Sequence, residues 1–405
     1  MNIKEFIKTC LGTVKRIPLL LSQLSVRSKN IYIFGAWYGE KFSDNSRALF
    51  LYALKNTDKK CFWVCKSKAL YQKLKIMGLP VLRTYSLKGI WYQLRAGVAF
   101  SSTGIVDFCR ELLGGCVHVE LWHGVGGGKK IGLDDRLYRE NILSARCRFY
   151  AWLERYALRK HYFVATSNEM KKVFQSAFLI PNDHFIFAGQ SRNDMFYDPD
   201  YKPETISKAE FGGKKVIVYM PTHRKAGQQQ LPMDTLLDLP QLNDFCEKNN
   251  AVFLIKKHFY HQREKEKLEQ YSNIIDITHR AVDSNELLLV ADCLISDYSS
   301  CTADYLLLDR PVLYYCFDYQ AYITQDRDLY WEFEDITPGP KCESFGQLLD
   351  AMQNVFDNKQ DYASERKRVR DLFYDPACQG PAAFKVLNRV ERILNPSIDE
   401  VHNGK

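Results

Sequence analysis

After residue 30, short runs of apolar, β-branched and aromatic residues alternate with stretches whose apolar residues recur at helical spacing. Helical patterns of this kind cover residues 46–54 (SRALFLYAL) and 67–78 (SKALYQKLKIMG). Strands separated by helices predict βαβ units and a parallel sheet. The expected strands of this first series are residues 31–35, 61–65, 98–102, 117–121 and 162–166.

A polar stretch interrupts the pattern at residues 191–214, and the alternation then starts again. The second series of expected strands is 216–220, 252–256, 273–277, 292–296 and 311–315, with helices at roughly 343–357, 360–373 and 381–394. We predict an α/β chain with two Rossmann-like domains, 31–190 and 215–375, a linker at 191–214, and a C-terminal helix and tail at 376–405. Ligands of such sheets bind beyond the carboxyl ends of the strands, so the loops there are expected to hold the chemistry.

The composition is that of a soluble globular protein, with 46% hydrophobic and 26% charged residues among 405. An excess of basic residues gives a net charge of +8, which favours anionic partners. The twelve cysteines are about 3% of the chain, far below the density of disulfide scaffolds. No CxxC pair is present. We therefore expect reduced thiols in a cytosolic protein and no structural zinc site.

Residues 1–30 combine an apolar helical face with many cations. The longest apolar run there, Ile17–Leu21, is far shorter than the roughly 20 residues that span a bilayer. The pattern predicts an amphipathic segment on an anionic membrane surface, with an ordinary packed helix as the alternative. A second candidate surface is 143–160, for which packing in the core is favoured. The basic residues that oppose the single acid Glu5 are Lys4, Lys8, Lys15, Arg16, Arg27 and Lys29.

A glycine-rich loop, HGVGGGKK, follows the expected strand 117–121. Its glycines allow backbone geometries closed to other residues, and their N–H groups can approach phosphate oxygens. Lys129 and Lys130 add positive charge, and His123 stands at the end of the strand, where a catalytic group would face the ligand. A tight turn is the alternative. The loop is not a Walker loop, because the GxxxxGK[ST] pattern is absent.

Polar and cationic residues also follow three expected strands of the second half. Thr222, His223 and Arg224 end one strand, Lys256, Lys257 and His258 end the next, and Ser299 and Ser300 begin a helix after a third. Hydroxyls and free N–H groups at a helix start favour anions, although a plain N-cap would use the same residues. Together these clusters predict a phosphate-rich donor. No acidic pair at metal-binding spacing accompanies them, so we expect no metal cofactor and charge neutralisation by the cations.

The residues Trp122–Gly132 resemble the WHGTPLKKIG-type motif of bacterial CDP-glycerol glycerophosphotransferases, which build teichoic acids and related polymers. The resemblance covers most of residues 31–340 and implies a GT-B-like pair of Rossmann domains with the nucleotide in the cleft, attached to the cytoplasmic face of the membrane. The further matching motifs, in order, are SDNSRALFLYAL (43–54), TSNEMKKVFQSAF (166–178), GQSRND (189–194), YMPTHR (219–224), KKHF (256–259), ISDYSSCTADYLLLDRPVLYY (295–315) and PGP (338–340).

The resemblance implies a reaction in which an acceptor hydroxyl attacks the β-phosphorus of a CDP-polyol and expels CMP. His123 would act as the general base or orient the acceptor, and His258 would contact the pyrophosphate or protonate the departing CMP. Asp304 would face a sugar or polyol hydroxyl. The implied donor-binding residues are Gly124, Val125, Gly126, Gly127, Arg192, Thr222, His223, Lys256, Lys257, Ser299, Ser300 and Asp304.

Departures from the family pattern leave the identity of the donor open. Val125-Gly126-Gly127 replaces Thr-Pro-Leu, Phe259 follows His258 where proline is usual, and His223 stands at an aromatic position. We expect CDP-glycerol or another CDP-polyol as donor and a lipid-linked or polymeric acceptor, in teichoic acid or capsular polysaccharide synthesis. The expected partners include an anionic membrane but no nucleic acid, and the oligomeric state stays open.

Two other functions are compatible with the sequence. A GT-B glycosyltransferase that uses a nucleotide sugar would have the same fold, which does not separate the two reactions. A non-catalytic protein could bind nucleic acid or lipid through a basic surface. The cations stand at strand ends rather than in one stripe with stacked aromatic residues, which disfavours nucleic acid.

Overall fold

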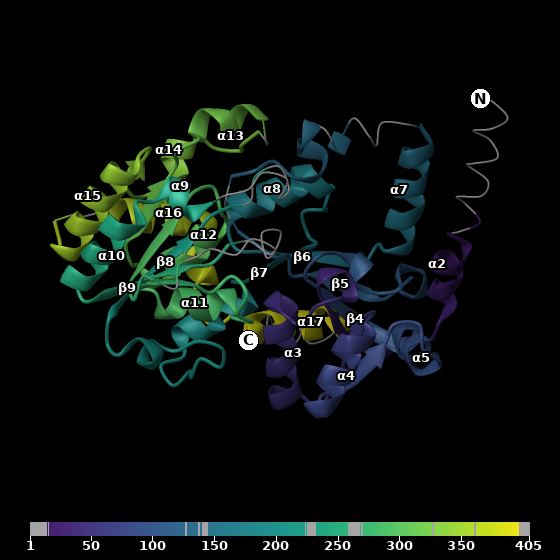
Figure 1. The fold of residues 1–405 in the computed structure, drawn as a ribbon. Coiled ribbons are helices and arrows are strands. Elements are labelled where there is room, and N and C mark those ends of the chain that lie inside the picture. Colours follow the sequence, from purple (N-terminus) through teal and green to yellow (C-terminus); the bar gives the residue numbers. More distant parts are fainter. Residues whose placement is uncertain are drawn as a thin grey trace, which may run out of the picture. The chain divides into compact units, whose positions relative to one another are not determined.

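The fold was examined in a computed structural model, and the parts of the chain it describes form two compact units. One unit comprises Met1–His123, Ile131–Tyr197 and Pro376–Lys405, and the other comprises Gly124–Lys130 and Asp198–Asp375 (Figure 1). The described residues are 14, 16–125, 128–136, 138–139, 145–222, 224, 232–257, 268, 270–325, 328–359 and 362–396.

The first unit is built on a seven-stranded sheet in the order β3-β2-β1-β4-β5-β6-β7. Every neighbouring pair is parallel. The strands are β1 Ser28–Gly35, β2 Lys60–Cys65, β3 Val81–Arg83, β4 Ala96–Ser101, β5 Val117–Glu120, β6 His161–Ala165 and β7 Phe185–Phe187. The helices are α2 Ile17–Leu21, α3 Asp44–Asn56, α4 Lys68–Ile76, α5 Leu87–Arg95, α7 Ala145–Ala157, α8 Asn168–Phe178 and α17 Ala383–Leu394.

Alternate residues of β1 face two different apolar layers, as strand geometry requires. Phe34 packs with Phe50 of α3 and stacks on Phe100 of β4, whereas Ile33 belongs to the layer on the opposite face of the sheet. The C-terminal helix α17 buries Val386, Leu387, Val390 and Leu394 in the same layer as α3. The last helix of the chain therefore completes the core of the first unit.

The second unit is a six-stranded parallel sheet in the order β10-β9-β8-β11-β12-β13. The strands are β8 Lys215–Met220, β9 Ala251–Ile255, β10 Ile274–Asp276, β11 Cys293–Ser296, β12 Val312–Tyr315 and β13 Lys341–Cys342. The helices are α9 Met233–Leu236, α10 Leu239–Lys248, α11 Ser284–Val290, α12 Cys301–Tyr305, α13 Tyr319–Gln325, α14 Phe333–Ile336, α15 Phe345–Phe356 and α16 Ala363–Phe373. Side-chain caps begin several of them; Asp283, for example, accepts the Asn285 N–H at the start of α11.

The predicted pair of parallel α/β sheets is confirmed, and all ten expected strands are present with their ends within three residues of the expected ones. The sequence did not predict β3, β7 and β13, which are two or three residues long. Runs this short carry too few positions to show a period of two.

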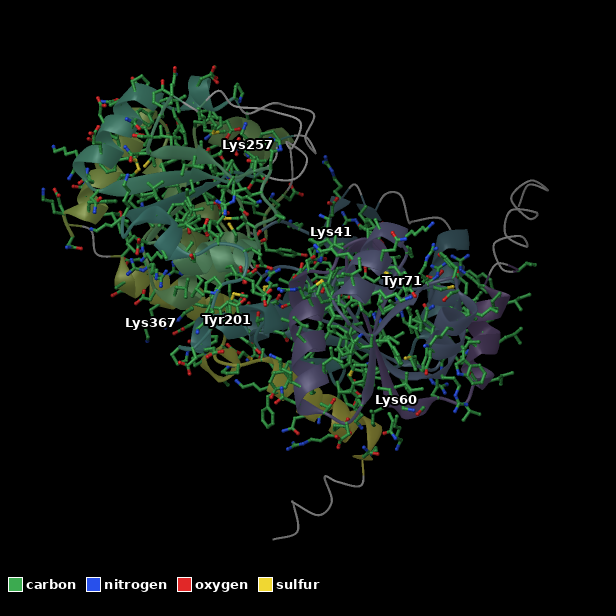
Figure 2. All side chains as sticks on the ribbon, turned by 60° about the horizontal axis from the view of Figure 1, so that its bottom comes forward. Lys41, Lys60, Tyr71, Tyr201, Lys257 and Lys367 are labelled. Atoms are coloured by element: carbon green, nitrogen blue, oxygen red, sulfur yellow. The ribbon has the colours of Figure 1, made fainter. Side chains whose placement is uncertain are left out.

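Part of the stretch predicted as a linker is fastened to α11. Residues 191–197 form a 3₁₀ helix of the first unit, and the second unit begins at Asp198. The buried carboxylate of Glu286 accepts hydrogen bonds from the Tyr201 hydroxyl, at 2.6 Å, and from the N–H groups of Glu204 and Thr205 (Tyr201 is labelled in Figure 2). Burial alone would raise the pKa of Glu286, but these donors outweigh it and the pKa is lowered.

The described part of the N-terminal segment packs on the first unit, as the alternative of an ordinary packed helix predicts, and its binding to a membrane stays a prediction. Arg27, predicted as one of its surface cations, donates instead to the carbonyl oxygens of Ser22, Gln93, Leu112 and Gly114 at 2.6–3.0 Å. Residues 1–13 lie outside the described residues. Among the residues that the structure describes, no helix has the length and apolar character needed to cross a bilayer.

Candidate active site

Both sheets have a point at which the strand order reverses, and ligands of open parallel sheets bind at such points. In the first unit it lies between β1 and β4, and in the second between β8 and β11. The loops after β8 and β11 carry the predicted residues Thr222, Ser299 and Ser300, whereas most of the others follow β5, β7 and β9 of the two sheets. Each unit therefore has its own candidate binding edge.

In the first unit, His123 follows the buried strand β5 through a strained residue, Trp122, whose φ is +60°. The His123 Nδ1 lies 2.9 Å from the carbonyl oxygen of Ser102, which follows β4. A carbonyl only accepts hydrogen bonds, so in the neutral imidazole Nδ1 carries the proton and Nε2 has the lone pair. The ring also lies against Trp122 and Trp37, at centroid distances of 4.4 and 5.7 Å. This geometry suits a proton acceptor.

A buried polar network supports the backbone on both sides of His123. The Glu120 carboxylate accepts the Trp122 N–H at 3.0 Å and the Ser101 hydroxyl, and the Ser101 oxygen lies 2.7 Å from His118 Nε2. Burial raises the pKa of Glu120 and lowers that of His118, so the interior favours neutral forms of both groups. Glu120, which the sequence analysis did not single out, thus holds the main chain just before His123.

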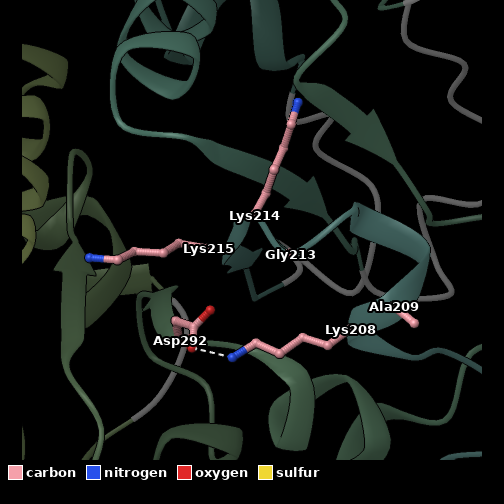
Figure 3. Close-up of a pocket in the computed structure, with 6 residues that line it drawn as sticks. All are labelled: Lys208, Ala209, Gly213, Lys214, Lys215 and Asp292. Carbon is pink, nitrogen blue, oxygen red and sulfur yellow. Dashed lines mark hydrogen bonds and ion pairs between the residues drawn. The ribbon is translucent and has the colours of Figure 1, made fainter.

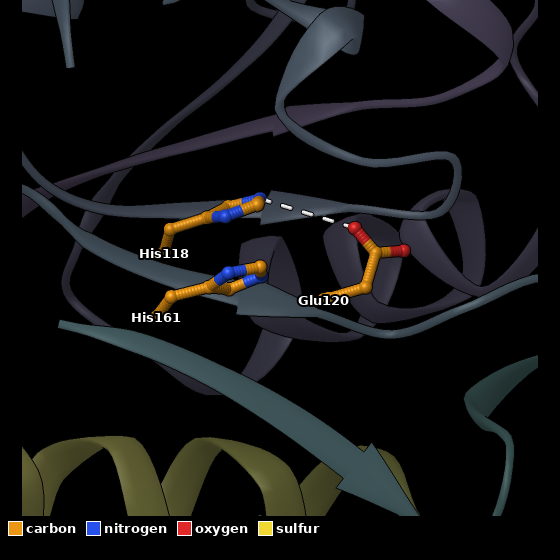
Figure 4. Close-up of side chains that lie close together, drawn as sticks. All are labelled: His118, Glu120 and His161. Atoms are coloured by element: carbon orange, nitrogen blue, oxygen red, sulfur yellow. Dashed lines mark ion pairs between the residues drawn. The ribbon is translucent and has the colours of Figure 1, made fainter. Parts of the chain in front are cut away.

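His118, Glu120 and His161 form a cluster that could be considered as a metal site, because each offers one potential ligand atom and these atoms lie within 4.8 Å of one another (Figure 4). The two imidazole rings stack, with centroids 4.4 Å apart and an angle of 25° between the planes. Stacked rings direct their in-plane lone pairs along nearly parallel planes rather than toward one point. The Ser101 hydroxyl moreover bridges His118 and Glu120. The geometry fits a hydrogen-bonded core better than a metal site.

Two motifs far apart in the sequence converge on the same backbone. Asn45, at the start of α3, donates to the Trp122 carbonyl at 2.9 Å and accepts the Arg192 N–H at 3.1 Å. The Arg192 guanidinium donates to the His123 carbonyl at 2.9 Å and pairs with Asp44 at 2.7 Å. Arg192, predicted as a donor contact, therefore positions His123 in this structure, and its contact with a donor stays a prediction.

In the second unit, the loops after β8 and β11 are joined by a buried ion-pair network. Thr222 donates through its N–H and hydroxyl to Asp297 at 2.9 and 2.6 Å. Arg224 lies between Asp297 and Asp318, at 2.9 and 2.6 Å. Burial opposes the charge of Arg224, but these carboxylates outweigh it and raise its pKa. Because two carboxylates already hold Arg224, it shapes the loops rather than serving as a phosphate ligand.

The other predicted donor contacts of this unit lie at the same edge. The Lys256 ammonium donates to the Arg280 carbonyl at 2.9 Å, and partial burial lowers the pKa of Lys256. The next residue, Lys257, is fully buried. Ser299 and Ser300 directly precede α12, and the Ser300 side chain makes no capping hydrogen bond there. The plain-cap alternative therefore does not describe Ser300.

The end of the glycine-rich loop is part of the second unit. The Tyr330 N–H donates to the Gly128 carbonyl at 2.6 Å, and the Lys130 N–H donates to the Asp328 carbonyl at 2.9 Å. A Cβ on Gly124 would lie 3.1 Å from the Ser300 hydroxyl oxygen. Glycine at position 124 thus lets the loop backbone approach the Ser299–Ser300 turn closely.

Two predicted donor contacts are placed differently from the expectation. The Val125 side chain is only 1% exposed and packs in the interior. Asp304 is 2% exposed and accepts a hydrogen bond from the Tyr374 hydroxyl at 2.5 Å, and its contact with a ligand hydroxyl stays a prediction. The Val125 side chain is apolar, the Asp304 side chain is hydrogen-bonded, and both are buried. Gly126, Gly127, His223 and His258 lie outside the described residues.

A cavity of about 310 Å³ in the second unit lies away from these loops, at the amino-terminal end of β8. Figure 3 shows the ion pair between Lys208 and Asp292, and the side chains of Lys214 and Lys215 pointing in different directions. Lys208 pairs with Asp292, Lys214 donates to the Asn273 side chain, and Lys215 lies over the Phe356 ring. Cations engaged in this way do not form a phosphate site. The lining residues are Lys208, Ala209, Gly213, Lys214, Lys215 and Asp292.

Two parallel α/β units with polar loops at their strand ends define the GT-B-like class, and comparison with solved structures supports it. The wall teichoic acid polymerase TagF superposes with a TM-score of 0.74 and 20% identity, over 98% of this chain and 100% of that chain. The UDP-GlcNAc 2-epimerase of Neisseria meningitidis bound to UDP-GlcNAc gives a TM-score of 0.52 and 12% identity, over 90% and 99%. At these identities the likeness concerns the fold.

The sequence profile described as CDP-glycerol:poly(glycerophosphate) glycerophosphotransferase matches residues 19–392. The chain belongs to this family, and it is a transferase. It is 26% identical to the teichoic acid glycerol-phosphate transferase of Staphylococcus aureus over 388 residues, covering 93% of this chain and 95% of that protein. It is 27% identical to the teichoic acid poly(glycerol phosphate) polymerase of Bacillus spizizenii over 399 residues, covering 95% and 97%.

Proposed function

We propose that this transferase moves glycerol phosphate, or a related polyol phosphate, from a CDP-activated donor to a hydroxyl of a lipid-linked or polymeric acceptor in teichoic acid or capsule synthesis. The observation that carries the proposal is His123, with Nδ1 bound to the Ser102 carbonyl and Nε2 left to accept a proton. Family membership and the full-length relatives support the donor class.

In the proposed reaction, the acceptor oxygen forms a bond to the β-phosphorus while His123 Nε2 takes the hydroxyl proton. The bond from the β-phosphorus to the bridging oxygen breaks, and CMP leaves with that oxygen. Positioning and charge stabilisation account for most of the catalysis of such transfers. Thr222, Lys256, Ser299 and Ser300 supply hydroxyls and charge at the strand ends of the second unit. His258 as proton donor to CMP remains a prediction.

A donor panel tests the proposal. The protein is incubated with CDP-glycerol, CDP-ribitol and UDP-sugars, each with a lipid-linked glycerol phosphate acceptor, and the products are identified by mass. We expect CMP release and a product heavier by one or more polyol phosphate units with a CDP-polyol, and neither with the UDP-sugars. A product heavier by a sugar, with release of UDP, would instead show a glycosyltransferase and contradict the proposal.

We also propose that the first unit binds an anionic membrane through α2, α7 and the turn after α2. The two candidate membrane surfaces of the sequence adjoin, because Arg16 pairs with Glu154 of α7 at 2.7 Å. This shared surface exposes large apolar side chains, including Leu24 at 82% and Trp152 at 60%. Exposed cations flank it at Arg155 and Arg159. Apolar side chains beside cations suit the headgroup region of an anionic leaflet.

Sedimentation with phosphatidylglycerol vesicles tests this surface. We expect the double variant Leu24→Ser, Trp152→Ser to lose most of the binding of the wild type, because exposed apolar anchors insert below the headgroups. High salt should release part of the bound wild type, since cation attraction is screened. Phe384→Ser, which changes an apolar residue 57% exposed on α17, is the matched control. Equal sedimentation of the double variant and the wild type would contradict the proposal.

A further inference from the structure

The loop after β1 is strained beside His123. Trp37 and Tyr38 have φ values of +50° and +60°, a region that bulky residues rarely occupy. The buried Asp107 stabilises this conformation, because its carboxylate accepts the Tyr38 N–H at 2.7 Å and the N–H groups of Ser102 and Thr103 at 3.1 Å. Strain that the surrounding structure fixes so firmly is typical of functional sites.

This loop lies at the reversal of the strand order. β1 and β4 are the two strands between which the order reverses in the first unit, and Trp37–Lys41 follows β1 while Ser102–Asp107 follows β4. The Asp107 hydrogen bonds join these two loops directly. The strained loop and the Ser102 carbonyl that orients His123 are therefore parts of one edge, where open parallel sheets bind ligands.

The loop presents a cation and aromatic faces on the His123 side. The Lys41 ammonium lies 4.9 Å from the centre of the Trp37 ring, and that ring lies 5.7 Å from the His123 ring. These two distances place the ammonium no farther than about 11 Å from the imidazole centre. Tyr38 is 59% exposed, which is unusual for a large side chain in a strained, fixed position. Partial burial lowers the pKa of Lys41, and the Asp44 carboxylate acts in the opposite direction.

We propose that Trp37, Tyr38 and Lys41 form the acceptor subsite, which binds the terminal polyol phosphate of the acceptor with its hydroxyl toward His123 and its phosphodiester on Lys41. In a glycerol phosphate unit, the free hydroxyl and the phosphorus are separated by a few single bonds, roughly 5 Å. With hydrogen-bond contacts of about 3 Å at each end, such a unit reaches about 11 Å, which is the upper limit of the distance between the ammonium and the imidazole centre. The Trp37 ring, which neighbours both groups, offers an apolar face to the carbon chain. This inference rests on the proposed function, which assigns proton acceptance to His123.

Acceptor kinetics and binding test the subsite. With saturating CDP-polyol, Lys41→Gln should raise the KM for a short glycerol phosphate oligomer on the order of tenfold, because one charge-assisted contact is lost. The kcat and the CDP-polyol Kd should stay within about threefold of the wild type, because this contact forms equally in ground and transition states. Lys41→Arg should restore most of the affinity. Lys60→Gln, at the amino-terminal start of β2, is the matched control (Figure 2 labels both lysines).

A neutral acceptor separates a charge contact from a structural effect. Free glycerol used as acceptor lacks the phosphodiester, so its reaction should be insensitive to Lys41→Gln. An unchanged oligomer KM in Lys41→Gln, or equal losses with glycerol, would overturn the subsite. Calorimetric binding of the oligomer to wild type and Lys41→Gln gives the same comparison without turnover. Absence of transfer by the wild type with every CDP-polyol would contradict the proposed function, whereas the calorimetric comparison would still decide the subsite.

Discussion

Replacing His123 with alanine is expected to lower kcat by a factor on the order of 10²–10⁴, which is the usual contribution of one proton-transfer group. The ring is held by the Ser102 carbonyl at Nδ1, so its loss removes an oriented proton acceptor at Nε2. The Kd for the CDP-polyol should change little, because the predicted donor contacts Thr222, Ser299 and Ser300 belong to the second unit. Initial rates of CMP release and calorimetric donor binding measure the two quantities.

The double variant Ser299→Ala, Ser300→Ala is expected to have the opposite effect to His123→Ala. It should weaken binding of the CDP-polyol donor and leave the melting temperature nearly unchanged. Loss of a helix cap costs only about 0.5–2 kcal/mol, and the Ser300 hydroxyl makes no capping bond.

If His123→Ala kept near wild-type turnover while remaining folded, the histidine would be structural. Reduced donor affinity in His123→Ala with normal kcat would show instead that the histidine contributes to donor binding and not to proton transfer.

Arg27→Met is expected to destabilise the protein by about 3 kcal/mol or more. The guanidinium donates to four carbonyl oxygens at 2.6–3.0 Å, and each buried acceptor left without a donor costs about 1–3 kcal/mol. Burial lowers the pKa of Arg27, because protein atoms replace much of the water around its guanidinium. Urea unfolding followed by circular dichroism measures the change.

Lys29→Met is the matched control, because the Lys29 ammonium contacts only the exposed side chain of Asn395 among the interactions described. It should change the free energy of unfolding by less than about 0.5 kcal/mol. Equal stability of Arg27→Met and Lys29→Met would show that the buried contacts of Arg27 contribute nothing. An N-terminal deletion meant to test membrane binding should therefore end before residue 14, because removing residues 1–29 would also remove Arg27.

The alternation of apolar runs was sufficient to predict both sheets, because residues 31–35 and 216–220 are central strands buried on both faces. The short edge strands were missed because β7 and β13 depend on pairing with their neighbours rather than on their own sequence. The return of α17 to the first unit was also not visible. Its apolar face shows only that it packs, and not which sheet it packs on.

The site was predicted in part, because residues at strand ends are recognisable from the strands themselves. His123 and Ser300 were placed at such ends by pattern and resemblance. Asp107 and Glu120 were missed, because a buried carboxylate that holds backbone N–H groups leaves no spacing signal in the sequence. Asp304 was interpreted from its motif alone, and its partner Tyr374 lies 70 residues farther along the chain.

The place of α17 has a consequence for how the chain is made. A ribosome releases all seven strands of the first sheet before it has begun the second unit beyond the glycine-rich loop, yet the helix that covers Phe34, Phe50 and Phe100 emerges last. The nascent first unit must therefore wait with an open apolar face while residues 198–375 are synthesised and fold. During this interval the apolar layer that α17 completes is still open, and the second unit is the first to be finished.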